Sequence, residues 1–215
     1  MPYVKNNSFD FMGILTRLSD LLVASVLFCV TCLPLVTIGP SLAALYHTVV
    51  KVVRKERGKV MATYFAAFRA NFRQGFLLGL ICIGYLLIGL ADVYLLQVFG
   101  YMYDANKFFY VVTWLYLLPL ALVFPWLFSY LSRFNDTVGR ILKNAFILGL
   151  TNIGKTLVCV LIIAIGVLIG CLFPAAIIII PGPVCWMISK RTEPEFKNLT
   201  QDQPVESGMD AWYNE

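Results

Sequence analysis

Charged residues are scarce in this sequence. Only 13% of its 215 residues are Asp, Glu, Lys or Arg and 60% are apolar, whereas soluble chains carry about 25% charged and about 45–50% apolar residues. Four stretches contain no charged residue, namely 21–50, 74–91, 108–132 and 156–189. About 20 helical residues cross the hydrocarbon core of a bilayer, so each stretch is long enough to span a membrane. The scarcity of charge therefore excludes an ordinary soluble domain.

The strict alternation of apolar and polar residues that a membrane β-barrel requires is also missing. Runs such as 162–169 and 176–180 are apolar on every face. Helices satisfy their own backbone hydrogen bonds inside a bilayer without closing a sheet. We therefore predict an all-α fold, a polytopic membrane helical bundle with about five transmembrane helices.

The predicted bundle is a single transmembrane domain, 1–190, followed by a polar cytoplasmic tail, 191–215. The stretch 156–189 would be about 50 Å long as one helix, too long for a single crossing. It is interpreted either as two spans divided near Pro174 or as one span plus a re-entrant segment. The expected spans are 18–38, 75–98, 108–131, 156–172 and 175–189, and amphipathic basic helices, 41–57 and 61–74, are expected at the cytoplasmic membrane surface.

Basic residues determine the expected orientation, because loops rich in Lys and Arg stay in the cytoplasm. The segment between the first two expected spans carries seven basic residues and one acidic residue, and Lys190 and Arg191 follow the last span. Five crossings then place the amino terminus outside and the carboxyl terminus in the cytoplasm. The basic helices are candidates for contact with a partner or with anionic lipid headgroups. Their candidate contact residues are Lys51, Arg54, Lys55, Arg57, Arg69 and Arg73.

Groups that carry out chemistry are few. The single histidine, His47, cannot form a histidine cluster for a metal ion, and no Ser, His and Asp constellation is evident. Cys29 and Cys32 form a C-x-x-C pair, but they lie in the first expected span, where buried thiols are inert. We predict no enzyme activity, no metal site and no cofactor.

One match to a phosphate-binding pattern needs its context. Residues from Gly149 to Thr156 fit G-x-x-x-x-G-K-[ST], whose backbone amides cradle phosphates when the loop follows a buried strand. Here no such strand precedes the pattern, and Thr156 begins an expected span. We therefore expect no nucleotide binding, and no nucleic-acid reader motif accompanies the basic residues.

Polar and conformational exceptions inside the spans are candidate functional features. Asp92 lies near the outer end of the expected span 75–98 and is either an interfacial residue or part of an ion or proton relay. The segment 174–183 is either a proline-containing hairpin or a partly unwound span of the kind that marks substrate sites in transporters. The pairs Gly75 with Gly79 and Gly166 with Gly170 predict close approach of helices.

Two blocks of sequence resemble a known family. The string TCLPLVTIGPSLAALYHTVVKVVRKERG, followed by FAAFRANFRQG, and the string LSRFNDTVGRILKNAFILGLTNIGKT are similar to the YesL family, small bacterial membrane proteins long classed under a domain of unknown function. The matching positions are Pro34, Thr37, Ile38, Gly39, Pro40, Ala44, Tyr46, Phe72, Arg133, Phe134, Asn144 and Ala145.

This resemblance implies a multi-pass protein of the bacterial cytoplasmic (inner) membrane that acts as an accessory or regulatory subunit of a carbohydrate (oligosaccharide) ABC import system. The implied partners are the lipid bilayer and the permease subunits, with the carbohydrate involved only indirectly. Two other classes stay open. One is a stand-alone transporter or channel for a small molecule or ion, and the other is a structural or sensory membrane protein.

Overall fold

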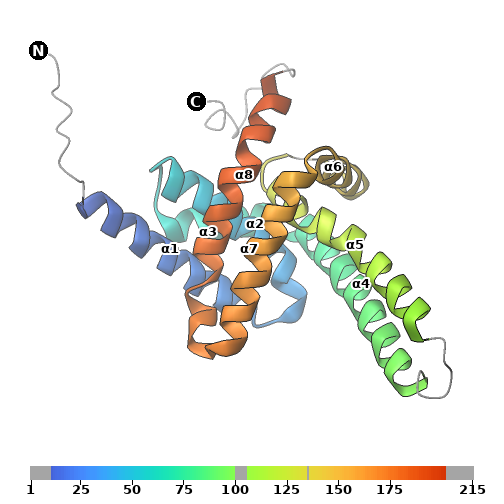
Figure 1. The fold of residues 1–215 in the computed structure, drawn as a ribbon. Helices are drawn as coiled ribbons and strands as arrows, with labels where there is room; N and C mark the ends of the chain where they lie inside the picture. The colour runs from blue at the N-terminus through green and yellow to red at the C-terminus, as the bar shows by residue number, and fades with distance from the viewer. Residues whose placement is uncertain (1–10, 100–105, 135, 202–215) are drawn as a thin grey trace, which may run out of the picture.

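A computed structural model describes residues 11–99, 106–134 and 136–201 (Figure 1). Within these residues the chain is helical and has no strand, which confirms the predicted all-α bundle. The helices are α1 (Phe11–Thr31), η1 (Leu35–Thr37), α2 (Ile38–Thr48), η2 (Val49–Arg54), α3 (Val60–Ala70), α4 (Phe72–Phe99), α5 (Asn106–Leu131), α6 (Val138–Thr151), α7 (Ile153–Leu172), η3 (Pro174–Ile178) and α8 (Pro181–Gln201).

Five segments are long and apolar enough to cross a membrane by length and composition. They are 12–31, 35–54, 72–95, 111–131 and 153–172, in the described part of the chain. The expected spans 75–98, 108–131 and 156–172 coincide with α4, α5 and α7 to within one turn of helix. The remaining candidates differ from the expected set, because 35–54 was expected at the membrane surface.

The segment 38–54 lies at the centre of the bundle, so the prediction of a surface helix at 41–57 was wrong. Leu45, Tyr46, Val49 and Val50 are each at most 3% exposed. Helix α2 continues directly into η2, a π-helical turn, and packs against α1, α3, α4 and α5. The basic residues that indicated a surface location occupy only the last turn of this segment and the loop after it.

Glycine permits the close contact between α2 and α4. A side-chain carbon built on Gly39 would lie 1.9 Å from the carbonyl oxygen of Gly75, and one built on Gly75 would lie 2.8 Å from the backbone of Pro40. No larger residue fits at either position without separating the helices. The predicted role of the Gly75 and Gly79 pair in close helix packing agrees with this contact.

The stretch 156–189 folds as a hairpin, in which α7 and α8 are joined through η3 (Figure 1). Ser25 of α1 holds the turn by hydrogen bonds. The Ser25 hydroxyl donates to the Leu21 and Ile179 carbonyl oxygens at 2.8 and 3.2 Å and accepts from the Gly182 amide at 2.8 Å.

Helix α8 also corrects the boundary of the tail. The helix continues to Gln201, and Thr192, Glu193 and Phe196 are buried in the bundle. Residues 191–201 are therefore part of the fold, whereas the rest of the expected tail, 202–215, lies outside the described residues.

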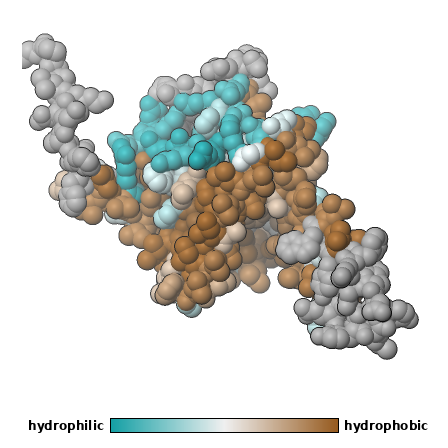
Figure 2. Space-filling view, in the orientation of Figure 1, coloured by the Kyte–Doolittle hydropathy of each residue, from teal (hydrophilic) through white to brown (hydrophobic). Residues whose placement is uncertain are grey.

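Helices α4 and α5, and helices α7 and α8, form two antiparallel pairs that run between two ends of the bundle (Figure 1). One end is polar. Arg17 of α1 pairs with Glu56 after η2, and Lys155 of α7 pairs with Glu195 of α8. Figure 2 shows hydrophilic residues gathered at this end and hydrophobic residues over most of the remaining surface. The first ion pair links the second turn of α1 to the loop after η2, and the second links the start of α7 to the second half of α8.

Candidate functional site

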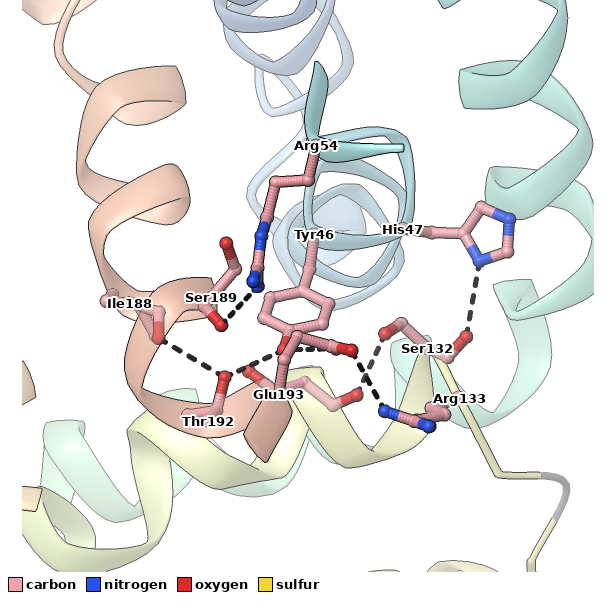
Figure 3. Close-up of polar contacts among 10 residues, drawn as sticks. Tyr46, His47, Arg54, Ser132, Arg133, Ile188, Ser189, Thr192 and Glu193 are labelled. Carbon is pink, nitrogen blue, oxygen red and sulfur yellow. Dashed lines mark hydrogen bonds and ion pairs between the residues drawn. The ribbon is translucent and has the colours of Figure 1, made fainter. Parts of the chain in front are cut away.

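A buried ion pair lies inside the bundle near its polar end. The Arg133 guanidinium, just after α5, donates to the Glu193 carboxylate of α8 at 2.9 Å, and the two side chains are 2% and 6% exposed. The Tyr46 hydroxyl of α2 donates to the other carboxylate oxygen of Glu193 at 2.8 Å and lies 2.7 Å from the Thr192 hydroxyl (Figure 3). We call these four residues the ionic cluster. It connects α2, the end of α5 and α8.

Further contacts surround the ionic cluster (Figure 3). Arg54 donates to the Ser189 carbonyl oxygen at 2.6 Å, and the His47 Nδ1 donates to the Ser132 carbonyl oxygen at 3.3 Å. The Arg133 guanidinium also lies 5.8 Å and 5.7 Å from the ring centres of Phe134 and Phe196. Cation–π contacts of this kind are stronger where the cation is desolvated.

Basic residues outnumber acidic ones around Lys55, at the polar end of the bundle. Burial lowers the pKa of Lys55 below its ordinary value, repulsion from Lys197 lowers it further, and Arg133 and Arg57 act in the same direction, while Glu193 opposes them. The Glu193 carboxylate is paired with Arg133 and accepts a hydrogen bond from Tyr46. These contacts provide the opposite charge and the hydrogen bonds that a buried carboxylate needs.

An apolar cavity of about 440 Å³ lies beside the ionic cluster. Tyr46 belongs to both, because its ring lines the cavity and its hydroxyl contacts Glu193. The lining residues are Phe28, Leu42, Leu45, Tyr46, Phe124, Pro125, Phe128, Ser129, Ile163, Gly166, Val167, Gly170, Cys171, Ile177, Ile180, Pro181, Val184, Cys185 and Ile188. A pocket of this size with mostly apolar walls is typical of sites for small molecules.

The structure brings two of the family-like positions, Tyr46 and Arg133, together in the ionic cluster. Glu193 was missed in the sequence because it falls in the expected tail. A signal was present, since Cys185, Ile188, Thr192 and Phe196 recur at helical spacing and continue past Lys190 and Arg191. All four side chains are buried in α8.

Other family-like positions shape the turn before α2 and its packing. The Thr37 hydroxyl donates to the carbonyl oxygens of Thr31 and Pro34, at 2.5 and 2.7 Å, which stabilises the turn between α1 and α2. Gly39 and Pro40 lie against α4, and Ala43 and Ala44 in the next turn are fully buried. These positions have structural roles in the described fold.

The remaining positions lie on α4, α6 and the segment before α6. Asn144 donates to the Tyr130 hydroxyl at 2.8 Å, and the Phe134 ring stacks on the Tyr130 ring at 4.5 Å. Phe72 is 39% exposed at the start of α4 and contacts the rings of Phe68 and Phe76. Phe72 is therefore a surface residue rather than a core residue.

The six basic candidates for partner contact do not form one surface. Arg54 is bound to α8 through the Ser189 carbonyl oxygen. Lys51 and Lys55 are half-buried, whereas Arg57, Arg69 and Arg73 are exposed. The two arginines at the end of α3 and the start of α4 are the part of this set that faces outward beside exposed aromatic side chains.

Asp92 does not belong to the ionic cluster or to the cavity. Its carboxylate accepts a hydrogen bond from the Thr113 hydroxyl at 2.6 Å, which links α4 to α5. Tyr85 and Tyr116 stack at 4.2 Å between the same two helices. The 174–183 segment does line the cavity, through Ile177, Ile180 and Pro181, and so does the pair Gly166 and Gly170.

The phosphate-loop pattern covers the junction of α6 and α7 and follows a helix. The Trp126 indole donates to the Thr156 hydroxyl at 2.9 Å, and Lys155 pairs with Glu195. A side-chain carbon on Gly149 would lie 2.6 Å from the Leu122 carbonyl oxygen. These residues are engaged in packing within the bundle, and the strand that a phosphate loop requires is absent from the described residues.

The cysteines that the structure describes are all free thiols, including Cys29 and Cys32. Cys29 lies 3.5 Å from the Ile177 carbonyl oxygen, in the contact between α1 and η3. In the described ranges, no group of three or more His, Cys, Asp or Glu side chains is placed to hold a metal ion.

Long apolar helices around a buried polar cluster define this chain as a multi-pass α-helical membrane protein. Residues 21–93 match the model of a family described as a protein of unknown function, DUF624. The match extends from α1 to the middle of α4 and includes the close contact between α2 and α4. No curated protein and no solved structure matches the chain.

Proposed function

We propose that this protein is an accessory or regulatory membrane subunit of a carbohydrate (oligosaccharide) ABC import system. The resemblance of 31–58 and 131–156 to the YesL family supports this role, and the match of 21–93 to a family of unknown function agrees with that resemblance. The role is one of protein contact rather than of catalysis. The structural observation that carries it is a mixed aromatic and basic surface on α3 and the start of α4.

That surface is the outward face of α3 and the first turn of α4. Helix α3 packs on α1 and α2 through its opposite face, and Tyr64 on that opposite face is fully buried. On the outward face, Met61 is 60% and Phe65 is 46% exposed. Arg69 and Arg73 are exposed beside them. We call these four residues the α3 surface.

The composition of the α3 surface fits a protein partner. Aromatic residues, Met and Arg are enriched at protein interfaces and supply most of their binding energy. Arg69 and Arg73 add positive charge to this surface, which can attract acidic groups of a partner. The proposed partner is therefore a permease subunit that contacts the α3 surface at the cytoplasmic face.

The same arrangement supports a revised topology. The polar end carries the basic segment after η2, the segment after α5 and the second half of α8, and such basic segments stay in the cytoplasm. We propose six passes, through α1, α2 with η2, α4, α5, α7 and α8, which place both the first turns of α1 and the end of α8 in the cytoplasm. This topology is an alternative to the expected one, in which the amino terminus lies outside.

Copurification from native membranes in a mild detergent tests the proposed function. Permease subunits are expected to be recovered with the wild-type protein and identified by mass spectrometry. The double variant Arg69→Glu/Arg73→Glu reverses the charge of the α3 surface and is expected to lower their recovery about tenfold, equivalent to about 1.4 kcal/mol of binding free energy.

The matched control is Lys143→Glu, which reverses an exposed charge on α6 without touching the α3 surface. This variant is expected to recover the permease subunits at the wild-type level. Recovery of the wild-type protein without permease subunits contradicts the proposed function. Equal loss in both variants contradicts the assignment of the contact to the α3 surface.

A further inference from the structure

We propose that the apolar cavity binds one hydrocarbon chain of a bilayer phospholipid. The proposal assigns a ligand to a site that the accessory function does not require. It depends on the chemistry of the walls, on the position of the opening and on the size of the space.

The walls offer a ligand almost no polar contact. Tyr46 and Ser129 bring the hydroxyl groups among the lining side chains, and both hydroxyl protons are already donated within the protein. The Tyr46 hydroxyl donates to Glu193 at 2.8 Å, and the Ser129 hydroxyl donates to the Pro125 carbonyl oxygen at 2.8 Å. A sugar or an ion entering this space would lose its hydration without replacement, whereas a hydrocarbon chain loses nothing.

The cavity opens toward the apolar surface of the bundle. Val167 and Ile177 line it and are 60% and 52% exposed. At its inner end, Leu45 and Tyr46 are 2% and 3% exposed. Since α7 carries no charged residue after Lys155 and is long enough to span the bilayer, the solvent at the opening is lipid hydrocarbon. Water does not fill a space with such walls, because it finds no hydrogen-bond partners there.

The shape of the space favours a thin ligand over a transmembrane helix of a partner. A spanning helix is about 30 Å long and about 10 Å in diameter, whereas the cavity has a volume of about 440 Å³. A single acyl chain is much thinner than a helix and can enter beside Val167 and extend toward Tyr46.

Photo-crosslinking of reconstituted protein tests the proposal. The probe is a phosphatidylglycerol with a diazirine near the end of one acyl chain, present in vesicles of phosphatidylethanolamine and phosphatidylglycerol. After illumination, mass spectrometry maps adducts on the α2 peptide that contains Leu45 and Tyr46. Lipid that merely surrounds the bundle cannot reach these buried side chains, so their modification reports occupancy of the cavity.

Val167→Trp places an indole in the opening and is expected to lower the yield of α2 adducts about tenfold. A tenfold loss corresponds to about 1.4 kcal/mol of binding free energy of the lipid chain. Adducts on Leu77 of α4, which is 50% exposed to lipid, should stay constant in the same sample. Leu168→Trp is the matched control, because Leu168 is the next residue, is 58% exposed and does not line the cavity. It is expected to leave the α2 adducts at the wild-type level.

Three results would overturn the assignment. The first is an α2 peptide without adducts in the wild-type protein, and the second is an equal yield in Val167→Trp and Leu168→Trp. The third comes from a parallel arm with the same diazirine chain as a free fatty acid. Labelling of α2 by the free acid alone would assign the cavity to a fatty acid rather than to a phospholipid.

Discussion

Replacement of Arg133 by methionine tests the ionic cluster directly. The change removes the cation that faces Glu193 at 2.9 Å and leaves a carboxylate that is 6% exposed. Tyr46 still donates one hydrogen bond to it, but that bond does not neutralise the charge. Breaking a buried ion pair by removing one partner costs about 3–5 kcal/mol. We expect Arg133→Met to lower the free energy of unfolding by about this amount.

The double variant Arg133→Met/Glu193→Met separates the pair from its surroundings. Apolar residues of similar volume often replace a buried pair at no net cost, so we expect the double variant to regain most of the stability. The interaction free energy in the double-mutant cycle should then be at least as large as the cost of Arg133→Met alone, about 3–5 kcal/mol. Thr192 and Tyr46, 2.7 Å apart, still satisfy each other in this variant.

Unfolding in mixed micelles with increasing SDS, followed by tryptophan fluorescence, measures these differences. The control is Arg140→Met, which breaks a surface pair with Asp136 at 3.7 Å. Arg140 is 73% exposed, and the expected cost is under about 1 kcal/mol. If Arg133→Met costs no more than Arg140→Met, or if the two changes in the ionic cluster are additive, the pair does not hold α8 in the bundle.

Three further predictions concern packing and topology. Gly75→Ala should prevent stable folding, because its new carbon lies 2.8 Å from the Pro40 backbone. The control, Gly84→Ala on the same helix, meets nothing within 4 Å and should fold like the wild type. Gel filtration in detergent distinguishes the folded from the misfolded protein. Trp126→Phe removes the hydrogen bond to Thr156 and should lower the unfolding free energy by about 1–3 kcal/mol in the same SDS assay. Reporter fusions at the two ends of the chain should both be active only in the cytoplasm, and opposite locations would contradict six passes.

The sequence was informative where charge marks the ends of a helix. Arg73 precedes the stretch that became α4, which contains only Asp92 as a charged residue after it, and Lys107 and Arg133 bracket the stretch that became α5. In these cases the absence of charge and the length of the crossing lead to nearly the same bounds. Both criteria follow from the cost of placing charge in hydrocarbon.

The use of charge to find the ends of a span was misleading at the turn between α1 and α2, because this turn lies in an uncharged stretch. Leu33 and Leu35 in this turn are 80% and 72% exposed, yet both are apolar, so no charge separates α1 from α2. The stretch 21–50 therefore resembled one span followed by a surface helix. The stretch 21–50 is longer than the roughly 20 residues that one crossing needs, as 156–189 also is, and this excess length indicates a turn. Pro34 and the short η1 helix make the turn instead.

The ionic cluster was unpredictable for a related reason. Hydropathy evaluates each residue alone, and by that measure Glu193 and Glu195 indicate a solvated tail. In the bundle, Glu193 pairs with Arg133 and Glu195 pairs with Lys155, while Lys190 lies 3.5 Å from the Trp186 ring centre. Pairing removes much of the cost of burying these charges. A charged helix can therefore complete a sixth pass, provided that its partners come from helices distant in the sequence, and only the fold determines which partners those are.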